Sequence, residues 1–167
     1  MNIEKEFKHH TDIQIRFNDI DLIGHVNNAI YQHFFDLARK RYFEEVIGAR
    51  LEWKTFGVVM ASICIDYFHA ITMEEKISVR SGIEVIGDKS ITMVQEIYNR
   101  DNGELKSQNR AVMVGYSPVK DKTTAIPSIW KEKIYDFERK VEFKHPDRKS
   151  TRLNSSHYRT SRMPSSA

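Results

Sequence analysis

One long helix followed by four strands in series is the feature that most constrains how this chain folds. Residues 28–47, NAIYQHFFDLARKRYFEEVI, predict a helix, and Gly48 stands where helices commonly end. The apolar residues of this segment are more numerous than the single stripe of a surface helix: Ile30, Tyr31, Phe34, Phe35, Leu37, Ala38, Tyr42, Phe43, Val46 and Ile47. We therefore expect the rest of the protein to enclose most of this helix.

The segments after this helix have a period of two. Rich in β-branched and aromatic residues, they predict strands over residues 58–70, 76–87, 90–100 and 104–117. Residues 87–89 and 101–103 contain glycine and are short enough to close hairpins. The pattern predicts four strands in a meander, with long antiparallel neighbours.

A strand before the long helix and a short helix near the end complete the pattern. Residues 11–17, TDIQIRF, alternate between polar and apolar residues, with Ile13, Ile15 and Phe17 expected to face inward. This pattern predicts a half-buried strand. Residues 128–139 have apolar residues at the spacing of one packed helix face. Helices and strands do not alternate, which excludes a doubly wound fold. The fold class is α+β, with the sheet curled around one helix.

Composition and cysteine content exclude several classes of protein. The 167 residues suit one domain, and no apolar run approaches the length of a membrane span. The first residues lack an apolar signal segment, which favours a cytoplasmic location. The single cysteine, Cys64, excludes an intrachain disulfide, and its apolar surroundings predict that it is buried.

The last 21 residues differ from the rest of the chain. Residues 147–157, DRKSTRLNSSH, resemble the translation of a common sequencing-library adapter. We interpret residues 1–146 as the domain and 147–167 as a disordered, non-native tail, with a natural basic tail as the alternative. The tail holds five of the 26 basic and one of the 23 acidic residues, so the rest has a net charge of −1. The basicity of the full chain therefore gives no argument for binding nucleic acid.

The loop before the long helix, RFNDIDLIGHVNN, has more polar and flexible residues than a helix cap requires. A cap at Asn27 or Asn28 explains only part of it. A calcium loop is excluded, because Ile23 and Ile30 occupy positions that need oxygen ligands. Zinc, phosphate-loop, dinucleotide and serine-elbow motifs are also absent. Acid–base or nucleophilic chemistry remains, with helix N–H groups holding an oxyanion and a nearby carboxylate acting on an activated carbonyl such as a thioester.

The loop carries a resemblance to a known family. Its pattern, Asp19-x-Asp21-x-x-Gly24-His25-Val26-Asn27-Asn28-x-x-Tyr31, resembles the signature of hot-dog-fold thioesterases, among them 4-hydroxybenzoyl-CoA thioesterase and its acyl-CoA and acyl-carrier-protein relatives. The resemblance is specific over residues 16–42. It implies a hot-dog fold, a long central helix wrapped by a curved antiparallel β-sheet. It also implies a homodimer or homotetramer with active sites at the dimer interface, and neither a metal nor another cofactor.

The resemblance also implies roles for individual residues. Asp21 takes the place of the catalytic carboxylate, as general base or nucleophile, and the Asn28 amide takes that of the group that polarises the thioester carbonyl. His25 matches a catalytic histidine of the plant acyl-carrier-protein branch. That branch has an asparagine where this chain has Ile23, so its full mechanism does not transfer. Some bacterial relatives have a Tyr-His pair where this chain has Asn27 and Asn28.

The remaining loop residues have structural alternatives. We expect Asp19 to order the loop through hydrogen bonds. His25 is either a proton donor to the leaving thiolate or a loop contact. Asn27 and Tyr31 are candidate substrate-binding residues, although capping the helix is the stronger expectation for Asn27 and a place in the core for Tyr31.

The predicted function is that of an acyl-CoA thioesterase, which hydrolyses an acyl thioester to a free acid and a thiol. Its expected partners are acyl-CoA or an acyl carrier protein and further copies of itself, with neither nucleic acid nor membrane. An acyl-carrier-protein thioesterase, a hot-dog dehydratase and a non-catalytic domain that binds acyl-CoA or acyl carrier are the alternatives. The sequence leaves the acyl group open, since aliphatic, branched and aromatic groups all suit an apolar pocket.

Overall fold

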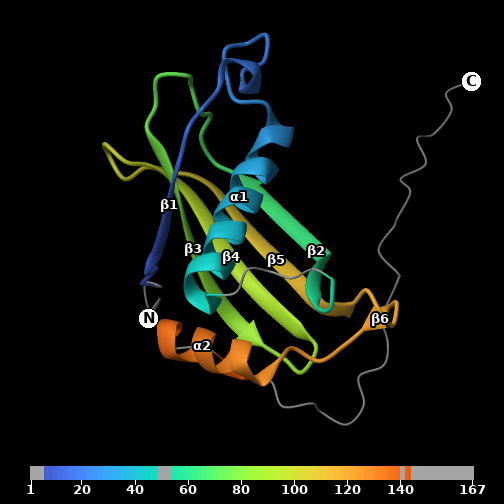
Figure 1. Cartoon of the computed structure of the whole chain (residues 1–167). Helices are drawn as coiled ribbons and strands as arrows, with labels where there is room; N and C mark the ends of the chain where they lie inside the picture. Colours follow the sequence, from blue (N-terminus) through green and yellow to red (C-terminus); the bar gives the residue numbers. More distant parts are fainter. Residues whose placement is uncertain (1–5, 49–53, 140–141, 144–167) are drawn as a thin grey trace, which may run out of the picture.

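The computed structural model describes residues 6–48, 54–139 and 142–143, so the tail predicted over residues 147–167 lies outside the described residues. The elements, shown in Figure 1, are β1 (His9–Ile13), the 3₁₀ turn η1 (Phe17–Asp19), α1 (Asn28–Ile47), β2 (Gly57–Tyr67), β3 (Ile77–Ile86), β4 (Ser90–Asn99), β5 (Leu105–Ser117), β6 (Lys122–Thr123), α2 (Ser128–Glu138) and β7 (Glu142–Phe143). Both helices and the four strands after α1 agree with the predictions to within a few residues.

The strands form one sheet in the order β1-β3-β4-β5-β2. All of these neighbours are antiparallel, while the short β6 pairs with β5 and β7 runs parallel to β3. The sheet is curved, and α1 lies across one face of it (Figure 1). This arrangement confirms the predicted α+β class, with one long helix on a curved antiparallel sheet.

The predicted meander is correct for β3, β4 and β5 and wrong for β2. Hairpins join the first three strands at the two predicted turns. β2 instead pairs with β5 along its whole length, from Gly57 opposite Tyr116 to Tyr67 opposite Ser107. The reason is the connection between β2 and β3: residues 68–76 are too long for a hairpin, so no local turn fixes the pairing.

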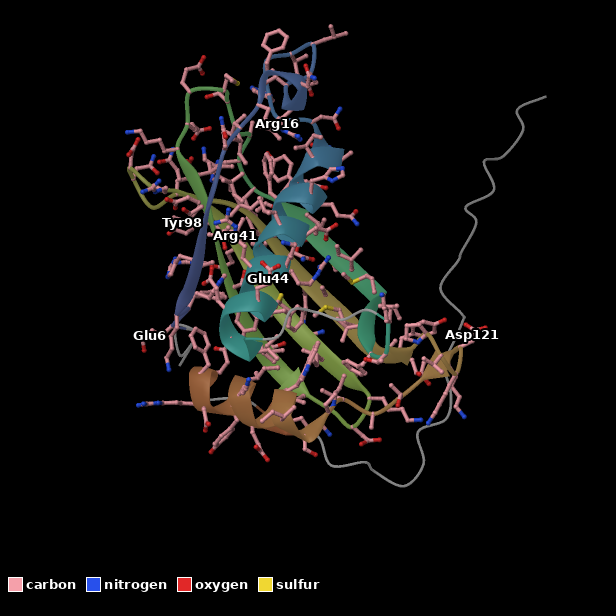
Figure 2. All side chains as sticks on the ribbon, viewed as in Figure 1. Glu6, Arg16, Arg41, Glu44, Tyr98 and Asp121 are labelled. Atoms are coloured by element: carbon pink, nitrogen blue, oxygen red, sulfur yellow. The ribbon has the colours of Figure 1, made fainter. Side chains whose placement is uncertain are left out.

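The predicted enclosure of α1 is present on one side only. Seven of its side chains are buried: Tyr31, Phe34, Phe35, Ala38, Tyr42, Phe43 and Ile47. The opposite side is exposed and mostly polar; its residues include Arg41 and Glu44 (Figure 2), together with the exposed Leu37. The helix ends at Gly48, whose φ of 67° is easily adopted only by glycine and whose N–H donates to the Glu44 carbonyl. No helix of the described residues is long and apolar enough to cross a membrane.

The core has two parts along α1. The half of α1 nearest its start packs with β1, β3 and Ile71, and the other half packs with α2 through Trp130 and Ile134. A buried carboxylate fixes α2, because Glu138 Oε1 accepts hydrogen bonds from the Tyr42 hydroxyl (2.5 Å) and the Ile83 N–H (2.8 Å). The buried face predicted for this helix is confirmed at Trp130 and Ile134.

Two side chains predicted to be buried are exposed. The strand predicted over residues 11–17 ends at Ile13, and Phe17 lies in η1 with 85% of its surface exposed. Cys64 is exposed as well. It lies on β2, which forms one edge of the sheet and therefore has a strand neighbour on one side only. The alternation of polar and apolar residues and the hydrophobicity of a segment do not predict which strand will form an edge of the sheet.

Candidate active site

Asp19 fixes the start of the loop that precedes α1. Its carboxylate accepts hydrogen bonds from the Arg16 backbone N–H (2.8 Å) and guanidinium (2.9 Å), and its carbonyl accepts one from the Asn27 N–H (2.8 Å). Burial raises the pKa of Asp19, but the contacts with Arg16 outweigh burial and hold this pKa below its ordinary value. With 1% of its surface exposed, Asp19 orders the loop as predicted and does not reach the cleft described below.

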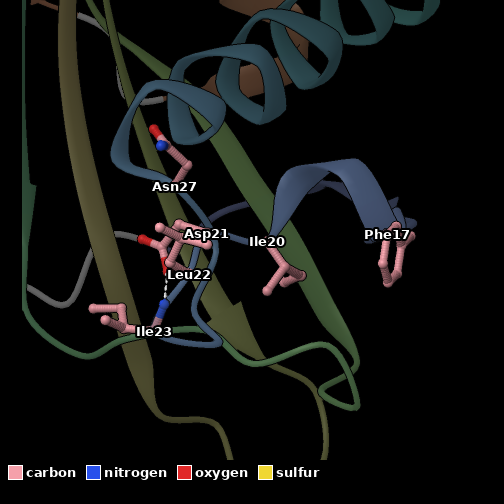
Figure 3. A pocket seen from close by; sticks show the side chains of 6 residues that line it. All are labelled: Phe17, Ile20, Asp21, Leu22, Ile23 and Asn27. Carbon is pink, nitrogen blue, oxygen red and sulfur yellow. Dashed lines mark hydrogen bonds between the residues drawn. The ribbon is translucent and has the colours of Figure 1, made fainter.

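Asp21 lies in a tight turn whose backbone N–H groups bind the Asp21 side chain. Its Oδ1 accepts hydrogen bonds from the N–H groups of Ile23 (3.0 Å) and His25 (3.3 Å), and its own N–H donates to the His25 carbonyl (2.8 Å). Gly24 adopts the positive φ of 81° that this turn requires. Among the described residues Oδ2 has no hydrogen-bond partner, so one carboxylate oxygen is held and the other remains available. Figure 3 shows the bond from the Ile23 N–H.

The start of α1 combines a cap with a free backbone donor. The Asn27 side chain accepts a hydrogen bond from the Ala29 N–H (3.0 Å), which confirms the predicted capping role. Asn28 is the first residue of the helix, and no described residue accepts a hydrogen bond from its N–H group. Such a group, at the positive end of the helix dipole, can bind an anionic oxygen.

A cleft of about 220 Å³ brings the predicted residues together with a wall from a distant part of the chain. Its lining comes from the loop, from the start of α1, and from the end of β2 with the residues after it: Asp21, Ile23, His25, Val26, Asn28, Tyr31, Tyr67, Phe68, His69 and Ala70. Four of the five predicted site residues therefore share one cleft. The fifth, Asn27, borders a neighbouring groove.

Tyr31 and Tyr67 join the two sides of the cleft. Their rings pack edge to face with centroids 5.0 Å apart, and the Tyr67 hydroxyl donates to the Asn28 carbonyl (3.3 Å). Tyr31 is only 3% exposed, as expected for a core residue, and it also lines the cleft. Burial raises the pKa of Tyr31 above its ordinary value, so its phenol stays protonated at neutral pH.

Sequence reasoning missed the wall formed by residues 67–70. These residues end the strand predicted over residues 58–70 with Tyr, Phe, His and Ala. Two aromatic residues and a histidine at a strand end were the available signal. The wall could not be assigned to the site, because its place beside α1 depends on the pairing of β2 with β5.

A second, apolar groove of about 750 Å³ shares Asp21 and Ile23 with the cleft, and Figure 3 shows its lining. Apart from Asp21 and Asn27 its lining is hydrophobic: Phe17, Ile20, Leu22 and Ile23. Leu22 and Ile23 are strongly exposed in the single chain. Asp21 therefore lines both the cleft, which has two histidines, and the apolar groove.

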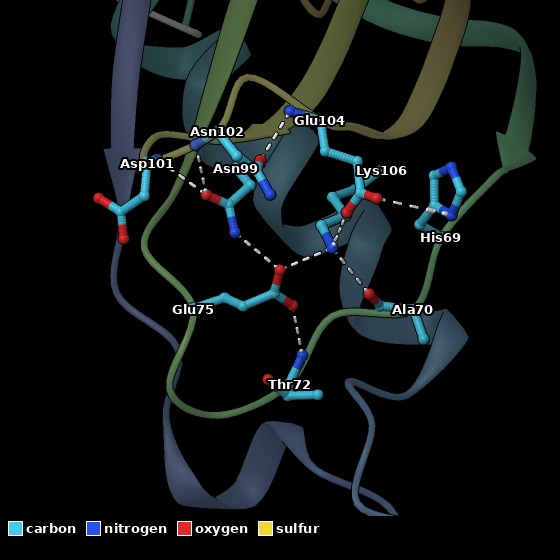
Figure 4. Close-up of polar contacts among 9 residues, drawn as sticks. All are labelled: His69, Ala70, Thr72, Glu75, Asn99, Asp101, Asn102, Glu104 and Lys106. Atoms are coloured by element: carbon cyan, nitrogen blue, oxygen red, sulfur yellow. Dashed lines mark hydrogen bonds and ion pairs between the residues drawn. The ribbon is translucent and has the colours of Figure 1, made fainter.

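A charged cluster lies behind the wall of the cleft (Figure 4). The Lys106 ammonium contacts Glu75 Oε1 at 2.6 Å, Glu104 Oε2 at 2.5 Å and the Ala70 carbonyl at 3.2 Å. Burial raises the pKa of Glu75, but the hydrogen bonds from Lys106, the Thr72 N–H and Asn99 outweigh it, and this pKa lies below its ordinary value. Burial lowers the pKa of Lys106, but the two glutamates outweigh it and hold the pKa above its ordinary value.

The site has no cluster of metal ligands in the described part of the chain. No three His, Cys, Asp or Glu side chains there lie together in a way that could hold a metal ion.

Comparison with known proteins identifies the family. Residues 15–134 match the family model of the thioesterase-like superfamily, and the chain belongs to this superfamily. Among curated proteins, the uncharacterized protein YsmA of Bacillus subtilis (strain 168) is 25% identical over 87 residues, which cover 52% of this chain and 58% of that protein. The chain thus spans little more than half the length of this relative.

Solved structures share the fold. A thioesterase from Thermus thermophilus, complexed with coenzyme A and Zn, is 28% identical with a TM-score of 0.71, and the match covers 82% of this chain and 98% of that one. The PA5185 protein from Pseudomonas aeruginosa strain PAO1 is 24% identical with a TM-score of 0.73, covering 79% and 92%. The fold is the hot-dog fold, as expected, and the family supports thioester hydrolysis in general as the class of reaction.

The cap at Asn27 can be tested separately from any role in chemistry. Replacing Asn27 by Ala removes the acceptor for the Ala29 N–H, and we expect the free energy of unfolding to fall by about 1 kcal/mol. Asn27→Asp keeps an acceptor oxygen and should unfold as the parent does. Urea denaturation followed by circular dichroism measures both. Equal stability of the Asn27→Ala protein and the parent would show that the cap contributes nothing.

The lowered pKa of Glu75 predicts a pH dependence of stability. A carboxylate whose pKa is lower in the folded than in the unfolded chain adds stability that is complete above the ordinary value of 4.5 and is lost as pH falls through the folded value. The difference in unfolding free energy between the parent and Glu75→Gln should therefore shrink as pH falls from about 6 to about 3. Urea denaturation across this range measures it, and a constant difference would contradict the prediction.

Proposed function

We propose that this chain is an acyl-CoA thioesterase, which hydrolyses an acyl thioester to a free acid and a thiol. One observation carries the proposal: in a single cleft, the Asp21 carboxylate is held by two backbone N–H groups near the start of α1, where the Asn28 N–H has no partner among the described residues. The coenzyme A bound to the T. thermophilus relative favours an acyl-CoA substrate.

Asp21 acts as general base or as nucleophile. As a base it takes a proton from the water that attacks the thioester carbonyl carbon. As a nucleophile, its Oδ2 attacks this carbon, and water then hydrolyses the anhydride. In both routes the carbonyl oxygen becomes negative, and the Asn28 N–H stabilises it at the positive end of α1. The carbon–sulfur bond breaks, and the thiolate leaves with the electron pair and takes up a proton.

Of the two hollows that Asp21 lines, the groove suits the acyl group of such a substrate. The groove is apolar apart from Asp21 and Asn27, so it suits the acyl group, with Asn27 at its border. The ring of Tyr31 adds apolar surface on the cleft side. His25 also lines the cleft, where its imidazole can supply the proton that the thiolate takes up.

The first test is thiol release by the full chain and by Asp21→Asn, with short, medium, long and aromatic acyl-CoAs and a thiol-reactive dye. We expect turnover by the parent and a loss of at least about 100-fold in kcat in the folded variant, because the base or nucleophile is gone. Asp136→Asn is the matched control. It removes an exposed carboxylate from α2 that neither lines the cleft nor lies on β2, and it should keep the parent rate.

The outcomes separate the alternatives. Thiol release from acyl carrier protein but not from any acyl-CoA would favour an acyl-carrier-protein thioesterase. Binding of acyl-CoA without thiol release, unchanged in Asp21→Asn, would favour a non-catalytic binding domain. We also propose that residues 1–146 form the functional unit and that 147–167 are a non-native tail. A chain ending at Pro146 should then match the full chain in rate.

We propose in addition that two copies of the chain pair through β2 to form a homodimer. β2 is an edge strand of eleven residues, from Gly57 to Tyr67, that carries exposed apolar side chains: Val59 is 41%, Met60 38% and Tyr67 47% exposed. A long apolar edge of this kind favours pairing with another strand. Since the cleft wall begins at Tyr67, the partner would border the cleft.

Light scattering after size exclusion measures the assembly. We expect the mass of two copies, or four if dimers pair further. Val59→Lys puts one charge per copy on the edge, so each interface carries it twice, and the dissociation constant should rise by about tenfold or more. Val119→Lys changes an equally apolar side chain, 77% exposed, in the turn between β5 and β6 rather than on β2, and should leave the mass unchanged. A parent with the mass of one copy would contradict the proposal.

A further inference from the structure

The position of the cleft wall depends on one irregular segment of the chain. Residues 68–76 leave β2 at the edge of the sheet, cross the ends of β5 and β4, and enter β3. Their first three residues line the cleft. Further along, the Ile71 carbonyl accepts a hydrogen bond from the Val26 N–H (2.8 Å) of the loop before α1. A shift of this segment would therefore change the width of the cleft opposite Asp21.

Lys106 holds this segment with both its main chain and its side chain. Its carbonyl accepts hydrogen bonds from the N–H groups of Phe68 (2.9 Å) and His69 (3.2 Å), and its ammonium donates to the Ala70 carbonyl (3.2 Å). The Lys106 side chain is 6% exposed, and the three donors of its ammonium match three acceptors, on Ala70, Glu75 and Glu104.

Glu75 fixes the same segment further along the chain. Its Oε2 accepts a hydrogen bond from the Thr72 N–H (2.8 Å), and its Oε1 accepts one from the Asn99 side chain at the end of β4 (2.8 Å). The segment is thus joined to the end of β4 through Asn99 and to the start of β5 through the Lys106 cation, as Figure 4 shows. Without that cation, Glu75 and Glu104 would face each other as like charges.

We propose that Lys106 is a positioning residue of the cleft. Its side chain does not line the cleft, so it acts on the substrate through Phe68, His69 and Ala70. This inference rests on the proposed function for its kinetic readout. The hydrogen bonds that hold the Asp21 carboxylate and cap α1 lie within the loop before α1, and this loop joins the segment at Ile71, beyond the three wall residues that Lys106 contacts. Loss of the Lys106 ammonium therefore weakens substrate binding more than the chemical step.

Three variants of the full chain test this role. Lys106→Met removes the cation and keeps an apolar stem of similar length. Adding Glu75→Gln to it removes the unpaired buried carboxylate, which should recover much of the lost thermal stability. Arg80→Met is the matched control, because it breaks an ion pair with the largely buried Glu96, between β3 and β4, that does not line the cleft.

We expect Lys106→Met to raise KM by about tenfold or more, with kcat within about threefold of the parent. The amides of Phe68, His69 and Thr72 should exchange with deuterium at least about tenfold faster, measured relative to the β4 amides. The double variant should keep both changes although its melting temperature recovers. Arg80→Met should show neither.

Several results would overturn the proposal. KM and amide exchange that return to parent values in the double variant would show that Lys106 serves stability alone. The same KM change in Arg80→Met would show an effect common to any lost ion pair. If Lys106→Met does not fold, the double variant decides. If the parent releases no thiol, the proposed function fails, while the exchange of the wall amides still tests whether Lys106 fixes the wall.

Discussion

The antiparallel pairing of β2 with β5 is the interaction on which the arrangement of the site depends. Because β4 and β5 separate β2 from β3, the chain between β2 and β3 has to cross the end of the sheet. This crossing carries residues 68–70 to the start of α1, where they face Asp21 and Asn28. With β2 beside β3, a short turn could replace the crossing, and the cleft would lose its second wall.

Side chains help to hold both irregular segments that meet in the cleft, because neither segment continues a ladder of paired strands. In the loop before α1, Asp19 and Asp21 accept backbone N–H groups, and Asn27 does so at the start of the helix. In the crossing segment, Glu75 accepts a hydrogen bond from the Thr72 N–H, and the Ala70 carbonyl accepts one from the Lys106 ammonium of β5. A site built from such segments is fixed before substrate arrives, which the proposed hydrolysis requires of its carboxylate and oxyanion donor.

Much of the fold could be predicted, because its signals are local. Asn27 and Gly48 mark both ends of α1, since capping depends on the few residues around each terminus. The hairpins of β3, β4 and β5 follow from short turns with glycine. The exposure of Phe17 and Cys64 was missed for the opposite reason. Burial depends on which elements pack against a residue, and the alternation of polar and apolar residues does not indicate those elements.

By itself, the sequence determined the α+β class, the bounds of α1 and the group of residues ahead of it. Asp21, His25, Asn28 and Tyr31 lie within eleven positions, so any helix that starts at Asn28 brings them close together. Only the tertiary structure decided that β2 forms the sheet edge, that residues 67–70 close the cleft, and that Lys106 lies behind them. Those contacts join residues that are from 31 (Lys106 and Glu75) to 59 (Gly57 and Tyr116) positions apart. Their formation depends on the energy of the whole packed sheet, which a local sequence pattern does not contain.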